Sequence, residues 1–255
     1  MVELLIILFG LAWGSFLNVV IYRLPRKLSL IKPGSFCPSC HHKIPFYNNI
    51  PLLSYLILKG KCRFCGRKIA FSYPLVEFLT PLSFLILYQK FSFNYFFIAS
   101  VLFTSALIVL AFIDYYHQIL PNEITLPGFA LFISYSFVHP FLNFGQALLG
   151  VILGAGFLLV IYWSYYSIRK IEGLGLGDVK MMLMVGAFLG WLKTFFTLIL
   201  GSFVAAIVGL FLIFLKKKDL KYSLPFGTFL APAAFVSLVW GGKIISAYLS
   251  LFRKP

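Results

Sequence analysis

Residues 95–113 read YFFIASVLFTSALIVLAFI, a run without one charged side chain that is long enough to cross a bilayer as a single helix. Similar runs recur along the chain, which is 61% hydrophobic and only 11% charged. Because soluble domains are ~25% charged, this composition excludes a soluble globular protein and a disordered chain. The pattern predicts an all-α, polytopic membrane protein with about eight transmembrane helices, near residues 4–22, 73–89, 95–113, 123–139, 146–166, 179–192, 195–215 and 228–251.

The net charge of +15 is distributed as a membrane topology predicts. Ten basic residues lie in one polar segment, from Arg23 to Lys68, and smaller clusters follow the fifth and seventh apolar runs. With the N-terminus outside, eight spans put 17 of the 22 basic residues on the cytoplasmic face, which is the positive-inside bias. We therefore expect membrane lipid as a partner and no nucleic acid.

All four cysteines lie in the polar segment 23–72, as Cys-Pro-Ser-Cys at 37–40 and Cys-Arg-Phe-Cys at 62–65. The two pairs belong to a short internal repeat with an offset of 25 residues. Two Cys-x-x-Cys turns supply the four thiolates of a tetrahedral zinc site, so the segment is predicted to be a small cytoplasmic zinc-ribbon-like loop domain. The predicted ligands of this structural Zn²⁺ are Cys37, Cys40, Cys62 and Cys65.

Other interpretations of the cysteines stay open at this stage. They are two disulfides, which are rare in a reducing cytoplasm, or free thiols. His41 or His42 could replace one cysteine as a ligand, although a solvated loop histidine is the simpler interpretation. Because a closed site with four thiolates leaves no position for a substrate, we expect this domain to be a scaffold and not a catalyst.

Asp114 and Asp178 are the informative pair among the seven acidic residues. Asp114 closes the run at 95–113, and Asp178 follows the glycines of Gly-Leu-Gly at 175–177 and opens the sixth run. Two spans separate them, so both are expected on one face of the bilayer, which is also the face of the cysteine loop. Two carboxyls that share a proton suit peptide hydrolysis, because the ionised one activates water while the protonated one polarises the carbonyl.

Each aspartate also has a simpler interpretation. Asp178 after glycines is a good helix N-cap, and Asp114 could be a solvated loop residue. A dinucleotide fingerprint is excluded because no strand precedes the glycines.

Glu77 lies inside the second run, where an ionisable residue is a functional candidate by default. The residues by themselves predict a carboxylate site of undefined chemistry.

Several motifs, taken in order, resemble those of the bacterial type IV prepilin peptidase family. Members of this family are intramembrane aspartic proteases with a Gly-x-Gly-Asp motif. The resemblance covers essentially the whole chain, and the ordered combination is highly specific. The matching stretches are GSFLNVVIYRLP at 14–25, the paired Cys-x-x-Cys loop, YPLVE at 73–77, Asp114 with LPN at 120–122, and GLGDVK at 175–180.

The resemblance implies an enzyme of type IV pilus or type II secretion systems. It would remove the short basic leader from prepilins or pseudopilins at the cytoplasmic boundary of the bacterial inner membrane, with Asp114 and Asp178 as catalytic residues. It would also N-methylate the new N-terminal residue with S-adenosylmethionine. The implied division is a first transmembrane helix at 1–22, the loop domain at 23–72 and the membrane-embedded aspartic peptidase domain at 73–255.

The residues that bind the methyl donor cannot be assigned from the sequence, and the polar segment with Glu77 is the first region to test. The competing hypothesis is a non-enzymatic membrane transporter or assembly subunit with a zinc-stapled cytoplasmic loop. A transporter would be expected to show repeated sets of spans and acids near the middle of the bilayer, whereas the acids here lie at an edge.

Overall fold

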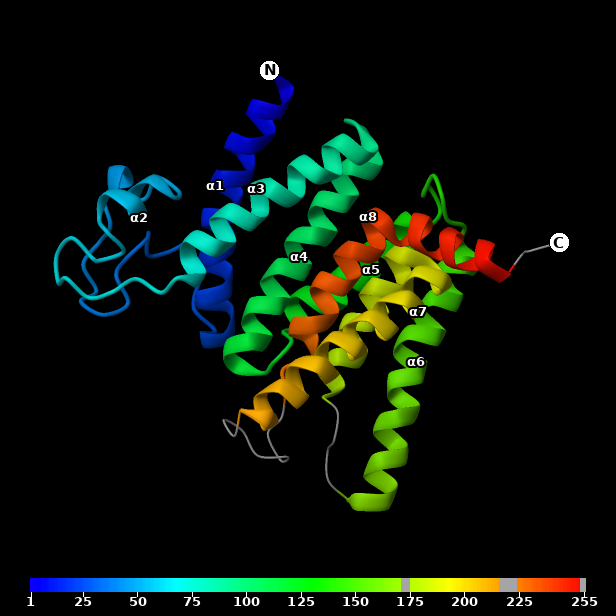
Figure 1. Ribbon diagram of the computed structural model, residues 1–255. Helices are drawn as coiled ribbons and strands as arrows, with labels where there is room; N and C mark the ends of the chain where they lie inside the picture. The colour runs from blue at the N-terminus through cyan, green and yellow to red at the C-terminus, as the bar shows by residue number, and fades with distance from the viewer. Residues whose placement is uncertain (171–174, 216–223, 253–255) are drawn as a thin grey trace. The chain divides into compact units, whose positions relative to one another are not determined.

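The computed structural model describes residues 1–170, 175–215 and 224–252 (Figure 1). Within these ranges the chain is helical and has no β-strand beyond two isolated bridges, which confirms the predicted all-α class. The chain divides into two compact units, Met1–Val109 and Leu110–Pro255. The α-helices are α1 (Val2–Arg23), α2 (Leu53–Ile57), α3 (Ser72–Phe91), α4 (Tyr95–His117), α5 (Asn122–Tyr135), α6 (Phe144–Arg169), α7 (Leu176–Phe214) and α8 (Phe226–Phe252).

Five of the described helices are long and apolar enough to cross a membrane, namely α1, α4, α6, α7 and α8. The protein is therefore a multi-pass membrane protein. The predicted runs at 73–89 and 123–139 correspond to α3 and α5, which are not among these five. With 14 residues, α5 is about 21 Å long, which is shorter than the hydrocarbon core of a bilayer.

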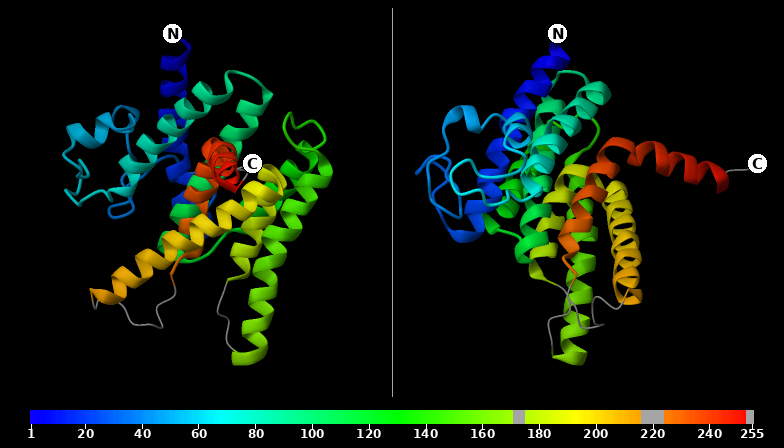
Figure 2. Two further views of the ribbon diagram at one scale, coloured as in Figure 1. Left: turned by 45° about the vertical axis from the view of Figure 1, so that its right-hand side comes forward. Right: turned by 60° about the vertical axis from the view of Figure 1, so that its left-hand side comes forward.

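The sixth and seventh predicted runs form the two arms of one 39-residue element, α7. Between the arms, Gly190 has φ 73° and ψ 171°, a conformation that residues with a side chain rarely adopt. The second arm turns back toward the end at which the first arm begins (Figure 2). The two predicted segments are therefore present, but a glycine kink joins them in place of a loop.

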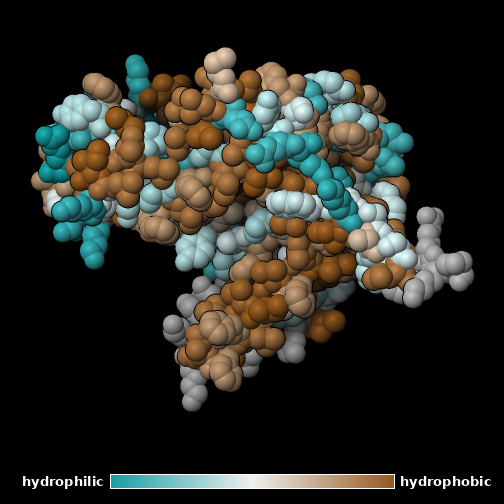
Figure 3. Space-filling view, turned by 45° about the horizontal axis from the view of Figure 1, so that its top comes forward, coloured by the Kyte–Doolittle hydropathy of each residue, from teal (hydrophilic) through white to brown (hydrophobic). Residues whose placement is uncertain are grey.

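The long helices expose large apolar side chains, which Figure 3 shows in brown over much of the visible surface. Trp163 is 57% exposed and Phe203 is 63% exposed. Such a surface would be unfavourable in water but is suited to lipid. The interior instead holds hydroxyl groups, as at Thr80 and Thr197, which are fully buried and donate to carbonyls of their own helices.

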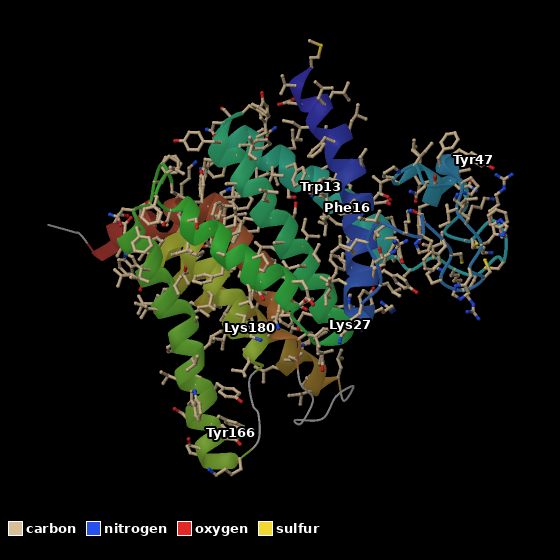
Figure 4. The ribbon with its side chains drawn as sticks, turned by 180° about the vertical axis from the view of Figure 1, so that it is seen from behind. Trp13, Phe16, Lys27, Tyr47, Tyr166 and Lys180 are labelled. Atoms are coloured by element: carbon tan, nitrogen blue, oxygen red, sulfur yellow. The ribbon has the colours of Figure 1, made fainter. Side chains whose placement is uncertain are left out.

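In the first unit, polar contacts hold α1 against its neighbours. Trp13, which Figure 4 labels on α1, donates from Nε1 to Oγ of Ser105 on α4 at 2.9 Å. Nearer the other end of α1, Asn18 donates from Nδ2 to the carbonyl of Tyr73 at 3.0 Å. Tyr73 lies in the first turn of α3, so this bond ties together the two helices between which the polar segment runs.

In the second unit, α6 and α7 cross at two pairs of glycines that are spaced four residues apart. Gly150 lies against Gly186, so closely that a Cβ on Gly186 would be 2.5 Å from the carbonyl carbon of Gly150. The pairs are Gly150 with Gly154 on α6 and Gly186 with Gly190 on α7. Gly190 also faces Gly150, whereas Gly154 faces a threonine side chain of α7. Small residues at this spacing allow two helices in a membrane to approach backbone to backbone. This crossing places the first arm of α7, which begins near Asp178, against α6.

Candidate active site and metal centre

The polar segment between α1 and α3 contains two turns of the same structure. Phe36 pairs with Lys43, and 25 residues later Lys61 pairs with Lys68, each as an isolated antiparallel bridge. In both turns the N–H of the first cysteine donates to the carbonyl five residues further along, at 3.0 and 2.9 Å. The repeat that was predicted from the cysteine spacing is therefore a repeat of backbone structure.

The two turns bring the four cysteine thiols together. Their Sγ atoms all lie within 4.8 Å of one another, and those of Cys37 and Cys65 are 4.0 Å apart. Tetrahedral zinc with Zn–S bonds of 2.3 Å separates its sulfurs by about 3.8 Å, so the cluster can hold a metal ion of this kind. The four cysteines are free, and neither His41 nor His42 belongs to the cluster.

The backbone around the first turn favours a thiolate. Burial opposes ionisation of Cys37, but hydrogen bonds from the backbone N–H groups of Cys40 and Ser39, together with those from the thiols of Cys40 and Cys62, lower the pKa of Cys37 to about 7. Since metals bind the thiolate and not the thiol, this local structure assists the first step of metal binding.

Arg23 has a structural role that its charge alone did not indicate. It is 4% exposed, and its guanidinium donates to the carbonyls of Ser29, Pro33 and Gly34 at 2.9, 2.7 and 3.0 Å. These bonds use the planar, forked donor geometry that distinguishes arginine from lysine. Arg23 therefore holds the first part of the polar segment against the end of α1.

Glu77 holds a later part of the same segment. Its Oε2 accepts the N–H of Leu52 at 2.8 Å, and its carboxyl also interacts with the side chain of Ser15 on α1. Leu52 has φ 61° and precedes α2, so the carboxylate satisfies an N–H at a helix start. The predicted functional candidate in α3 thus contacts the loop domain directly.

Asp114 lies in the last turn of α4 and is only 5% exposed. The interpretation as a solvated loop aspartate is therefore wrong, because α4 continues for four residues beyond the end predicted from hydropathy, to His117. A carboxylate near the C-terminal end of a helix faces the negative end of the helix dipole. The charge of Asp114 must consequently be stabilised by groups from outside α4.

Those groups come from the first turn of α8. The N–H of Thr228 donates to Oδ2 of Asp114 at 2.7 Å, and Oγ1 of Thr228 lies 3.1 Å from the same oxygen. The N–H of Gly227 also interacts with the Asp114 carboxyl. A helix start leaves its first N–H groups without partners in the helix, so α8 supplies donors to a carboxyl group 114 residues away in sequence.

Asp178 is the third residue of α7 and is 7% exposed. The N-cap of α7 is Gly175, so the interpretation of Asp178 as the N-cap residue is wrong. Its carboxyl does interact with the N–H of Gly175, as an acidic side chain at this helix position commonly does. It also interacts with the N–H of Gly227 and electrostatically with Asp114. The start of α8 is therefore next to both aspartates.

Glycines make room for this close arrangement. A Cβ on Gly227 would lie 3.1 Å from Oδ2 of Asp114 and 3.1 Å from Cδ1 of Leu120. A Cβ on Gly177 would lie 3.0 Å from Cβ of the same Leu120. Leu120 is 9% exposed and fills the space between the starts of α7 and α8. A side chain at either glycine would require Leu120 or the Asp114 carboxyl to shift by a few tenths of an ångström.

A polar contact joins two further motif residues at this end of the second unit. Lys180, which Figure 4 labels near the start of α7, donates from Nζ to Oδ1 of Asn122 at 2.9 Å. Asn122 is the first residue of α5. The LPN and GLGDVK stretches, which are more than fifty residues apart in sequence, thus meet beside the aspartates.

Gly227 and Thr228 are the residues at this site that sequence reasoning missed. The signal for them was weak: a proline at 225 and a glycine at 227 at the beginning of the last apolar run. Nothing local relates that run to Asp114. Two other acidic residues, Glu172 and Asp219, lie outside the described residues.

Comparison with known proteins agrees with the motifs. Residues 8–91 match the Bacterial Peptidase A24 N-terminal domain, and residues 101–210 match the Type IV leader peptidase family. No solved structure matches the chain significantly.

Curated relatives match over nearly the full length. A protein of Aeromonas hydrophila is 36% identical over 97% of this chain and 94% of its own length. One of Pseudomonas aeruginosa is 36% identical over 95% and 92%, and one of Xanthomonas campestris is 31% identical over 94% and 92%. Each is named prepilin leader peptidase/N-methyltransferase. With this identity and coverage, the chain belongs to the type IV leader peptidase family, a family of proteases.

Proposed function

We propose that this protein is a membrane-embedded aspartic endopeptidase that removes leader peptides from prepilins or pseudopilins, and that it also N-methylates the new N-terminus. The relatives' printed name supports both activities. The observation that carries the peptidase assignment is the meeting of Asp114 and Asp178. These buried carboxyls, from distant parts of the chain, interact with each other and with the same backbone N–H of Gly227.

The chemistry follows from two carboxyl groups that share one proton, because two like charges this close do not both form. The ionised carboxylate takes a proton from water while the water oxygen adds to the peptide carbonyl carbon, and the other carboxyl gives its proton to the carbonyl oxygen. The first carboxyl then passes its proton to the departing nitrogen. The C–N bond breaks, and the second carboxyl recovers a proton from the tetrahedral intermediate.

We place this site at the cytoplasmic boundary of the bacterial inner membrane. The support is the bias of basic residues toward the loops on that side. A prepilin with a basic leader would present its cleavage point at the same boundary, and the reacting groups lie at helix ends where such a peptide can reach them.

The thiol cluster fits a structural zinc ion, because four soft donors from two equivalent turns converge on one point. Cys37, Cys40, Cys62 and Cys65 would hold it. When bound, the ion would cross-link two turns that bury little apolar surface of their own. Its role is to keep the loop domain folded between the anchors at Arg23 and Glu77.

S-adenosylmethionine is the proposed methyl donor, on the strength of the N-methyltransferase name of the relatives. When bound, it would supply the methyl group for the new N-terminal amine. We assign no residue to it, and the loop domain with Glu77 remains the first region to test. A non-enzymatic transporter or assembly subunit is not favoured, because the curated relatives above carry an enzymatic name.

The test is incubation of the reconstituted protein with a prepilin, with and without S-adenosylmethionine, followed by mass spectrometry of the product N-terminus. Asp114→Asn and Asp178→Asn should each lower the cleavage rate by at least ~100-fold. Glu3→Gln, which removes an exposed carboxylate at the start of α1, is the matched control and should cleave normally. Normal cleavage by either aspartate variant would refute the peptidase assignment, and a product that stays unmethylated would refute the second activity.

A further inference from the structure

The hydroxyl of Thr228 lies between two acceptors on α4. Its Oγ1 is 3.1 Å from Oδ2 of Asp114 and 3.1 Å from the carbonyl oxygen of Ala111. A threonine hydroxyl has one hydrogen to donate and lone pairs that can accept. It can therefore donate to Asp114 or to Ala111, but not fully to both at one time.

The charge of Asp114 decides between these two acceptors. An ionised carboxylate is the stronger acceptor, so the hydroxyl hydrogen turns toward Oδ2. A protonated carboxyl accepts more weakly, so the hydroxyl hydrogen turns to the carbonyl of Ala111, and Oγ1 can accept the carboxyl O–H whenever that proton is on Oδ2. Rotation about one C–O bond thus provides Asp114 with a partner in both protonation states, without movement of either helix.

A backbone N–H cannot do the same. The N–H groups of Gly227 and Thr228 that face Asp114 can only donate, so they serve the ionised form and not the O–H of the protonated form. Because this carboxyl gains and loses a proton in every catalytic cycle, a partner that can reverse its role suits both of its forms. Among the hydrogen bonds of Asp114 in the described part of the chain, only the one to Thr228 Oγ1 has that property.

We propose that Thr228 is a positioning residue whose hydroxyl turns between Asp114 and the Ala111 carbonyl as Asp114 changes protonation state. This inference rests on the peptidase function proposed above. The hydroxyl acts through Asp114 and exchanges no proton with the substrate. Its contribution belongs to the chemical step, so it should affect kcat and leave KM unchanged.

The experiment compares Thr228→Val, Thr228→Ser and Thr228→Ala in the reconstituted protein, with leader cleavage followed over a range of prepilin concentrations. Valine keeps the shape of threonine without the hydroxyl, whereas serine keeps the hydroxyl. Loss of a hydrogen bond to a charged group predicts that kcat falls roughly ten- to a hundredfold in the valine and alanine variants. The serine variant should stay within about threefold of the unaltered enzyme, and KM should change by less than about twofold in all three.

Thr197→Val is the matched control. Thr197 is a fully buried threonine of α7 whose hydroxyl donates to the carbonyl of Lys193 in its own helix. Its replacement should leave both kcat and KM unchanged. If Thr228→Val does not fold, the comparison rests on Thr228→Ala against Thr228→Ser.

Two results would overturn the inference. One is normal kcat in Thr228→Val or Thr228→Ala while Asp114→Asn is inactive. The other is a serine variant as impaired as the valine variant, which would mean that the methyl group matters and not the hydroxyl. Normal cleavage by Asp114→Asn would instead refute the proposed function itself, so the two failures can be told apart.

Discussion

The crossing of α6 and α7 allows a sharp prediction about stability. In Gly186→Ala the added Cβ would lie 2.5 Å from the carbonyl carbon of Gly150 and 2.7 Å from the backbone nitrogen of Val151. The carbonyl oxygen of Gly150 would be closer still, and ordinary contacts begin near 3.4 Å, so the backbones must separate by at least about 0.9 Å. These obstacles are backbone atoms and cannot rotate away. Overpacking of this kind costs about 1–3 kcal/mol, and sometimes more.

For a chain of this size, 1 kcal/mol lowers Tm by roughly 2–4 °C, so Gly186→Ala should lower the thermal unfolding midpoint by roughly 2–12 °C. The assay is thermal unfolding of the purified protein in one detergent. Gly156→Ala is the matched control in α6, because a Cβ there meets nothing within 4 Å. It should keep or slightly raise Tm, since alanine is the better helix former. Equal Tm values for the two variants would show that the helices do not meet backbone to backbone.

Three further predictions concern the loop domain and the kink of α7. Purified protein should contain one metal ion, and Cys62→Ser should lose it, as measured by elemental analysis. Hydrogen bonds lower the pKa of the metal-free Cys37 thiol to about 7. Because protons compete with the metal for the thiolates, acidification should release the metal, and its retention at roughly pH 4 would contradict thiolate ligation. Glu77→Leu should speed hydrogen exchange at the Leu52 amide roughly tenfold or more, while Glu77→Gln, which keeps an acceptor, should have a smaller effect; unchanged exchange in Glu77→Leu would refute the anchor. Gly190→Ala should destabilise the protein by about 1–3 kcal/mol in chemical unfolding, because its φ of 73° suits glycine; a neutral effect would mean that the kink has another cause.

The two anchors of the loop domain bear on how the two proposed activities are connected. Arg23 and Glu77 hold the cysteine-containing segment to α1 and α3 by hydrogen bonds, so the segment is not joined to these helices by a flexible linker. If the loop domain supports methylation, a variant that releases either anchor should lower the methylation rate more than the rate of cleavage by the aspartates. Separate measurement of cleavage and methylation in Glu77→Leu distinguishes these outcomes.

Much of the fold could be predicted from sequence because its signals are local. An apolar run such as 95–113 identifies a membrane helix from its own residues alone. The two Cys-x-x-Cys motifs share a spacing in the sequence, and the backbone bridges recur at the same 25-residue offset. The span count was less certain. A glycine near the end of an apolar run is compatible with either a loop or a kink. Only the backbone at Gly190 shows that the two runs belong to one element.

From the residues alone one can predict a helical membrane protein, a cluster of four cysteines that the structure confirms, and Asp114 and Asp178 as candidate functional acids at the ends of apolar runs. The groups that hydrogen-bond to these acids become visible only once the helices are packed together. The donors to Asp114 come from the start of α8, 114 residues further along the chain. Hydrophobic periodicity records which faces of a helix are buried, but it carries no information on which distant helix start completes a carboxyl group's hydrogen bonds.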